Sequence, residues 1–97
     1  MTINKIQNGA EATLQVEGRL DTVTAPELDK AINEIANAEK LDLDFAKLDY
    51  ISSAGLRVLL AAHKTFAKKG GMTVKNVNEI VADIFEVTGF NDILNIQ

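Results

Sequence analysis

The chain has 97 residues, of which 46% are hydrophobic and 25% are charged, with a formal net charge of −4 and no cysteine. A chain of this length buries roughly 60–70% of its unfolded surface around one core, so we expect a single domain over residues 1–97. The lack of cysteine excludes disulfides and thiolate metal sites, and the acidic balance without a basic stripe argues against nucleic acid as a partner. No apolar run reaches the roughly 18 residues of a membrane span, and the first residues do not resemble a signal peptide. We therefore expect a cytoplasmic protein that does not insert into membranes.

Two strands are predicted at the start of the chain. Apolar and polar residues alternate over 11–20, the period-two pattern of a strand with one buried face. Residues 2–7 come before it, and Asn8 and Gly9 between the two segments form a pair suited to a tight hairpin turn. We expect these two strands to pair antiparallel.

A helix and a third strand are predicted next. A helix is expected across residues 24–38. Thr24 and Glu27 have the spacing of a capping box at its start, and the apolar residues over 28–35 form one face of the helix. The segment 41–45 then alternates leucine and phenylalanine with aspartate, which indicates a strand. Because the intervening helix is long enough for a crossover, the strands on either side of it are expected to run parallel.

The second half of the chain repeats this alternation. Residues 54–69 predict a helix that stops at two lysines and two glycines, and 72–77 predict a short strand. A helix that starts after Asn78 and stops at Gly89 follows, and the tail 91–97 fits either a short helix or a strand. The pattern predicts an α/β fold with a mixed sheet of four to five strands covered by about four helices.

Two strand-to-helix junctions are expected to meet. If their strands are parallel, the junctions "GRLDTVTAPEL" and "YISSAGL" lie at the same carboxyl edge of the sheet, where α/β folds tend to keep their sites. The side chains that would converge there are hydroxyl and carboxyl groups: Asp21, Thr22, Thr24, Ser52 and Ser53.

Ser52 and Ser53 allow two interpretations. Serine is among the best residues for capping the free N–H groups of a first helical turn. A hydroxyl at a helix N-terminus is also a position where an added phosphate would meet free N–H groups and the positive end of the helix dipole. Such a phosphate would add about −1.5 to −2 charges, with Asp21 and Asp49 to repel it and Arg57 to attract it. Inside a partner's interface, an unmatched charge of this size would abolish a modest affinity.

Three segments together resemble the STAS domain, in particular the bacterial anti-sigma factor antagonists: "GRLDTVTAPEL", "LDLDFAKLDYISSAGLRVLL" and "VTGFNDIL". The resemblance covers nearly the whole chain. It implies a STAS fold and a partner-switching protein that binds a serine-kinase anti-sigma factor. In that family the kinase phosphorylates the antagonist with ATP, which breaks the complex, and a serine phosphatase reverses the modification.

The resemblance also implies roles for individual residues. Ser53 falls on the phosphoacceptor position. Many antagonists carry an aspartate immediately before that position, where this chain has Ser52, so Ser52 is an alternative acceptor. The residues that would surround the phosphosite are Asp21, Thr22, Asp44, Ala54 and Gly55, with Asp44 as the acid that ends the preceding strand. STAS domains that are not phosphorylated also exist, so a constitutive interaction subunit of a lipid-transport or signalling complex is the alternative function.

An enzyme is not predicted. His63 is the only histidine and lies ten residues after Ser53, roughly 15 Å along a continuous helix, which excludes a Ser–His pair. Alternation in a strand explains Asp42 and Asp44, so we expect no metal and no cofactor. We expect instead a partner-binding surface over the serine loop and the helix after it: Asp21, Thr24, Ser52, Ser53, Arg57, His63, Lys64 and Lys68.

Overall fold

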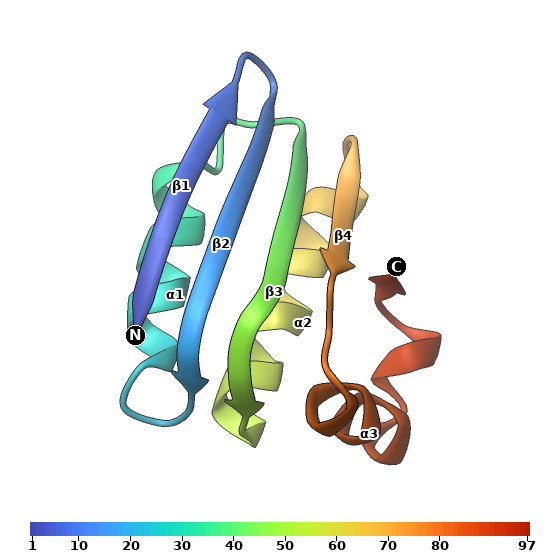
Figure 1. The fold of residues 1–97 in the computed structure, drawn as a ribbon. Helices are drawn as coiled ribbons and strands as arrows, with labels where there is room; N and C mark the ends of the chain where they lie inside the picture. The colour runs from blue at the N-terminus through green and yellow to red at the C-terminus, as the bar shows by residue number, and fades with distance from the viewer.

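The computed structural model describes residues 1–97 and contains a five-stranded sheet, three α-helices and one 3-10 turn (Figure 1). In chain order the elements are β1 (Thr2–Asn8), β2 (Glu11–Leu20), α1 (Ala25–Glu34), β3 (Lys40–Ile51), α2 (Ser53–Ala67), β4 (Gly71–Lys75), α3 (Glu79–Thr88), η1 (Phe90–Asp92) and β5 (Asn95–Ile96). The α/β class and the mixed sheet are confirmed. The expected fourth helix is only the 3-10 turn η1, and the tail contains both this turn and a two-residue strand.

The strands follow one another across the sheet in the order β1-β2-β3-β4-β5. β1 and β2 form the expected antiparallel hairpin, while β2, β3, β4 and β5 pair in parallel. Figure 1 shows α1 and α2 behind the sheet and α3 beyond the lower end of β4. In this view no helix lies in front of the central strands, and the junctions after β2 and β3 lie at the lower end of the sheet, which is its carboxyl edge.

The core lies between the sheet and its helices. It is one cluster of 23 buried residues, which includes Leu14 and Leu43 from the central strands and Leu28 and Phe66 from the helices that cover them. The alternating apolar residues in the sequence of β2 are the buried ones, because every second residue from Ala12 to Val16 points into the core.

β3 is longer than the period-two pattern predicts. It runs to Ile51, not only to Phe45, and its 12 residues pair with the 10 residues of β2 through two register shifts. Gln15 lies opposite Asp44 but Glu17 lies opposite Lys47, so β3 contains an extra residue at this point, as in a β-bulge. The bulge interrupts the alternation, which is why the sequence pattern stops early.

The helix boundaries also differ in places. α1 stops at Glu34 instead of continuing to Ala38, and no side-chain hydrogen bond caps its N-terminus, so the predicted capping box of Thr24 and Glu27 is wrong. α3 begins as predicted, because the Asn78 side chain accepts a hydrogen bond from the Val81 N–H at 2.8 Å. It stops at Gly89, whose φ of 80° is a left-handed conformation that glycine adopts easily.

α2 approaches the sheet most closely at its first turn. A Cβ atom at Gly55 would lie 2.6 Å from Leu20 Cγ and 2.8 Å from Ile51 Cγ1, both in buried residues at the ends of β2 and β3. Glycine is therefore required here by the space between the helix and the two strands, even though it is a poor helix former.

We predict that Gly55→Ala lowers the free energy of unfolding by about 1–3 kcal/mol, measured by urea denaturation, because the methyl group overpacks this contact. Helix propensity alone predicts the opposite sign, a gain of about 1 kcal/mol. In a Leu20→Ala background the loss should shrink, since the nearest clashing atom is gone. An increase in stability for Gly55→Ala would contradict this account.

Candidate functional site

The two junctions meet at the carboxyl edge of the sheet, as the sequence predicts. Leu20 and Ile51 are partners at the ends of β2 and β3, and the Ser52 N–H donates a hydrogen bond to the Leu20 carbonyl at 2.8 Å. Asp21 and Ser52, the next residue on each strand, are thereby held beside each other. We refer to residues 19–24 and 50–53 as the serine edge.

The loop from Asp21 to Thr24 is held by its own side chains. The Thr24 hydroxyl accepts a hydrogen bond from the Asp21 N–H at 2.9 Å and donates one to the Arg19 carbonyl at 2.7 Å. The Asp21 carboxylate accepts the N–H groups of Val23 at 3.0 Å and Thr24 at 3.1 Å. Thr24 thus uses its hydroxyl to close this loop, which is the physical reason that it does not cap α1. Thr22 lies exposed at the centre of the same loop.

Asp21 is a carboxylate that the loop keeps ionised. The hydrogen bond from the Thr24 N–H lowers its pKa most, and burial raises the pKa by less than this bond lowers it. The Thr24 hydroxyl, the Val23 N–H and the Arg19 guanidinium lower the pKa further. Its Oδ2 lies 3.9 Å from Arg19 Nε. The serine edge therefore contains a fixed negative charge on an ordered loop.

The two serines differ in accessibility. Ser52 occupies the N-cap position of α2, yet its side chain caps nothing and its Oγ atom is buried without a hydrogen-bond partner. Ser53 is the first residue of α2 and is exposed. Capping therefore does not account for either hydroxyl, and Ser53 is the serine whose side chain faces solvent at the mouth of the helix.

The other predicted site residues separate into two groups. Ala54 and Gly55 follow Ser53 in the first turn of α2, and Gly55 is buried against the ends of β2 and β3. Asp44, in contrast, does not end a strand: β3 continues for seven residues beyond it, to Ile51. At about 3.3 Å per residue, this places Asp44 roughly 23 Å along the strand from Ile51, the residue just before the two serines.

α2 carries the predicted partner-binding residues along its length. Arg57, Lys64 and Lys68 are exposed, and Arg57 lies one turn after Ser53. His63 is only half-buried, with its Nδ1 atom buried and without a hydrogen-bond partner. The exposed cations give this helix a basic outer side.

Three residues of the serine edge were not singled out from the sequence. The Arg19 guanidinium lies 4.5 Å from the centre of the Tyr50 ring, a cation–π contact between partners in the β2–β3 register. Val23, at the tip of the Asp21 loop, is 82% exposed. Tyrosine and arginine are the residues most often found to anchor protein interfaces. Only the bulged register brings Arg19 and Tyr50 together, so a period-two pattern could not indicate the pair.

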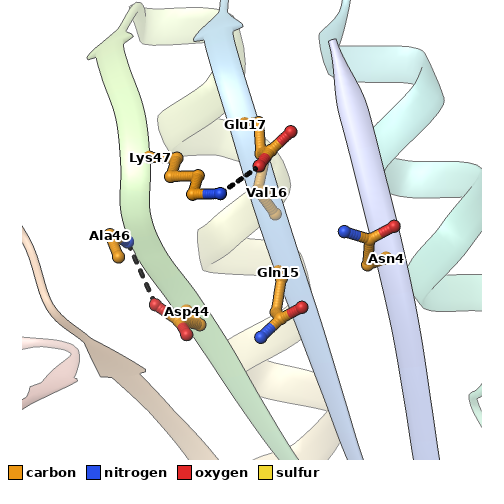
Figure 2. A pocket seen from close by; sticks show the side chains of 7 residues that line it. All are labelled: Asn4, Gln15, Val16, Glu17, Asp44, Ala46 and Lys47. Atoms are coloured by element: carbon orange, nitrogen blue, oxygen red, sulfur yellow. Dashed lines mark hydrogen bonds and ion pairs between the residues drawn. The ribbon is translucent and has the colours of Figure 1, made fainter.

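The two hollows of the structure lie away from the serine edge. Figure 2 shows one of about 90 Å³ on the open face of the sheet, where Lys47 pairs with Glu17 at 3.2 Å and Asp44 accepts the Ala46 N–H at 3.0 Å. A hydrogen bond from the Asn76 amide is the main cause that lowers the pKa of Asp44. A second hollow, of about 360 Å³, lies between β1 and α1. No residue of the carboxyl-edge loops around the two serines lines either one.

The low pKa of Asp21 predicts a pH dependence. A carboxyl group whose pKa is lower in the folded state contributes stability that is complete above its unfolded pKa, near 3.9, and is lost as the pH falls through the folded value. Asp21→Ala should therefore lower the melting temperature more at pH 6 than at pH 2. Thermal unfolding of both proteins across this range measures the difference, and a difference that stays constant with pH would contradict the role of the ionised loop carboxylate.

Comparisons with known proteins identify the family. The model of the STAS domain matches residues 2–97. The anti-sigma-B factor antagonist of Bacillus subtilis is 28% identical over 93 residues, which cover 94% of this chain and 85% of the relative. Among solved structures, an anti-sigma factor antagonist from Mycobacterium paratuberculosis superposes with a TM-score of 0.88 at 24% identity, over 98% of this chain and 83% of the other. SpoIIAA of Bacillus in its phosphorylated form gives a TM-score of 0.76 at 13% identity, over 99% and 91% of the two chains. None of the three α-helices combines the length and the hydrophobicity that a membrane span requires. By sequence and fold, the chain belongs to the STAS domain family.

Proposed function

We propose that this STAS protein is an anti-sigma factor antagonist that binds a serine-kinase anti-sigma factor and is released when the kinase phosphorylates Ser53. The name of the Bacillus subtilis relative supports the first part of this proposal. The observation that carries the second part is the contrast between the serines: Ser53 is exposed at the start of α2, whereas Ser52 Oγ is buried. A structural neighbour, SpoIIAA, is known in a phosphorylated form, which agrees with a modifiable STAS surface.

The free protein should tolerate a phosphate on Ser53. The first turn of α2 offers backbone N–H groups and the positive end of the helix dipole, and Arg57 lies four residues further along the same helix. The Asp21 carboxylate, which the loop keeps charged, repels the phosphate from the neighbouring strand end. These opposed effects act on an exposed group, so little stability is gained or lost.

The same phosphate would act strongly at an interface. A kinase that covers the serine edge removes water from Ser53, and a charge buried there without a counter-ion costs about 3–5 kcal/mol. Since each 1.4 kcal/mol is a factor of ten, the affinity falls by two to three orders of magnitude. Binding to the unmodified form and release of the modified form follow from this difference. A serine phosphatase would reset the switch, and we place the pathway in the cytoplasm, where sigma factors act.

A constitutive STAS interaction subunit is the second candidate function. The observation in its favour is Ser52, which stands where many antagonists have an aspartate. A serine at this position offers a kinase no local carboxylate to recognise, and its hydroxyl is buried. In this alternative the serine edge binds its partner permanently, and no modification occurs on either serine.

The phosphorylation test is direct. The purified protein is incubated with ATP and a lysate of its source organism, and tandem mass spectrometry should place the phosphate on Ser53. Ser52→Ala should be modified like the wild type, whereas Ser53→Ala should not be modified. Phosphate on Ser52, or none while a known substrate in the same lysate is phosphorylated, would sink the proposed switch.

Ser53→Asp tests the consequence for binding. It should weaken the kinase complex at least 100-fold in isothermal titration calorimetry and leave the melting temperature within a few degrees, because an acid at the first helical position favours the helix dipole. Ser53→Ala, which adds no charge, is the matched control and should bind like the wild type. A loss of folding in Ser53→Asp would contradict the mechanism.

Arg19 is predicted to anchor the same interface. Arg19→Ala should weaken the kinase complex at least tenfold, because it removes an exposed guanidinium stacked on Tyr50 beside the serines. The melting temperature should change little, since an exposed cation–π contact is worth about 0.5–1 kcal/mol. Lys5→Ala removes an equally exposed cation from β1 and should leave the affinity unchanged. Equal effects of the two variants would mean that only net charge matters.

A further inference from the structure

The outer side of α3 exposes apolar side chains to solvent. Ile80 is 58% exposed and Val87 is 86% exposed, and the half-buried Ile84 lies between them. Their spacing of four and then three residues places them on one face of the helix, over about 10 Å of its length. We call these three residues the α3 stripe.

Ile80 and Val87 lie outside the core, while Ile84 packs partly against it. The adjacent face of the helix, about 100° away, supplies Val81 and Phe85, which are completely buried. The helix is also held firmly, because the Asn78 amide donates a hydrogen bond to the Leu48 carbonyl of β3 at 2.8 Å while its oxygen caps α3. Ile80 and Val87 are therefore presented on a fixed element with their apolar surface in water, and Ile84 is partly exposed between them.

An acidic row runs alongside the α3 stripe. Glu79, Asp83 and Glu86 are exposed and have the same spacing, each one position before a stripe residue. None of the three ion pairs of the structure involves α3, and the helix contains no lysine or arginine. Like charges at these spacings destabilise a helix by about 0.2–0.5 kcal/mol per pair.

The stability of the free protein does not explain this surface. Glu86 lies in the last turn, where the helix dipole disfavours a negative charge, and Val87 beside it gains nothing from burial. An apolar row next to an unpaired acidic row has the chemistry of a surface whose partner supplies both the cover and the cations.

We propose that the outer side of α3 binds a basic amphipathic helix of another protein. A second helix with apolar residues at the same spacing can pack its apolar row along the α3 stripe. Lysine or arginine beside the apolar row of this second helix would pair with the three carboxylates of α3. Two copies of α3 would set acids against acids, which disfavours a symmetric self-contact. The acidic row would equally repel an anionic lipid surface.

This contact is separate from the proposed phosphorylation switch. It involves none of the residues of the serine edge, so it should not depend on the state of Ser53. A test that succeeds on α3 and is unaffected by Ser53→Asp would support the second surface, whatever the outcome of the phosphorylation experiment.

The probe is a 14-residue helical peptide with leucine along one face, lysine on both sides of it and alanine elsewhere. Titrated into the ¹⁵N-labelled protein at about 150 mM salt, it should shift the amide resonances of residues 79–88 most strongly. A peptide with glutamate in place of every lysine is the matched control and should bind at least tenfold more weakly. The affinity for Ser53→Asp should stay within twofold of the wild type.

Protein variants complete the test. The double variant Ile80→Ser and Val87→Ser should weaken the lysine peptide at least fivefold, whereas Ile6→Ser, which removes an exposed isoleucine from β1, should not. The double variant Glu79→Gln and Glu86→Gln should also weaken the lysine peptide at least fivefold. The charge-matched control, Glu11→Gln with Glu34→Gln, should leave its affinity unchanged. Shifts centred on α2, no shift of residues 79–88 at millimolar peptide, or self-association that Val87→Ser abolishes would overturn the proposal.

Discussion

The parallel pairing of β2 with β3 brings Leu20 opposite Ile51, and the Ser52 N–H closes that pairing on the Leu20 carbonyl at 2.8 Å. The chain then turns at once into α2, whose first turn approaches the same two strand ends so closely that only glycine fits at position 55. The position of Ser53 is a consequence of this contact. The buried side chains on both strands hold the register that places the serine edge.

The charges at this edge give a single phosphate its proposed effect. The Asp21 loop is closed by Thr24, and it keeps a negative charge beside the start of α2. In water the helix dipole and Arg57 would offset the repulsion between Asp21 and a phosphate on Ser53, whereas an interface without a counter-ion would leave the phosphate charge unmatched. A site of this kind needs no cleft and no catalytic group, and the hollows of the structure lie away from it.

Two helices present opposite chemistry to solvent. α2 exposes Arg57, Lys64 and Lys68, whereas α3 exposes three carboxylates beside an apolar row. Since the net charge of the whole chain is only −4, this separation comes from the distribution of the charges and not from their sum. If both surfaces bind, one domain of 97 residues contacts one partner in a modification-dependent way and another in a constant way.

The sequence by itself determined the elements whose burial follows a simple period. Alternation located β2, the caps Asn78 and Gly89 bounded α3, and the two junctions could be placed at one edge once their strands were taken as parallel. These features depend on neighbours within a few residues, which is why a single chain is enough to read them. The resemblance to STAS domains added the importance of Ser53.

The tertiary structure alone decided the features that depend on register. The bulge extends β3 to Ile51, leaves Asp44 far from the serines and stacks Arg19 on Tyr50. Ser52 Oγ is buried while Ser53 is exposed, and the Thr24 hydroxyl donates to the Arg19 carbonyl instead of capping the helix. The strand register is set by contacts between strands that are distant in the chain, whereas the Thr24 bond spans only five residues but leaves no trace in the periodicity. Periodicity indicates which face of a strand is buried, but not which residue of another strand lies opposite a given residue.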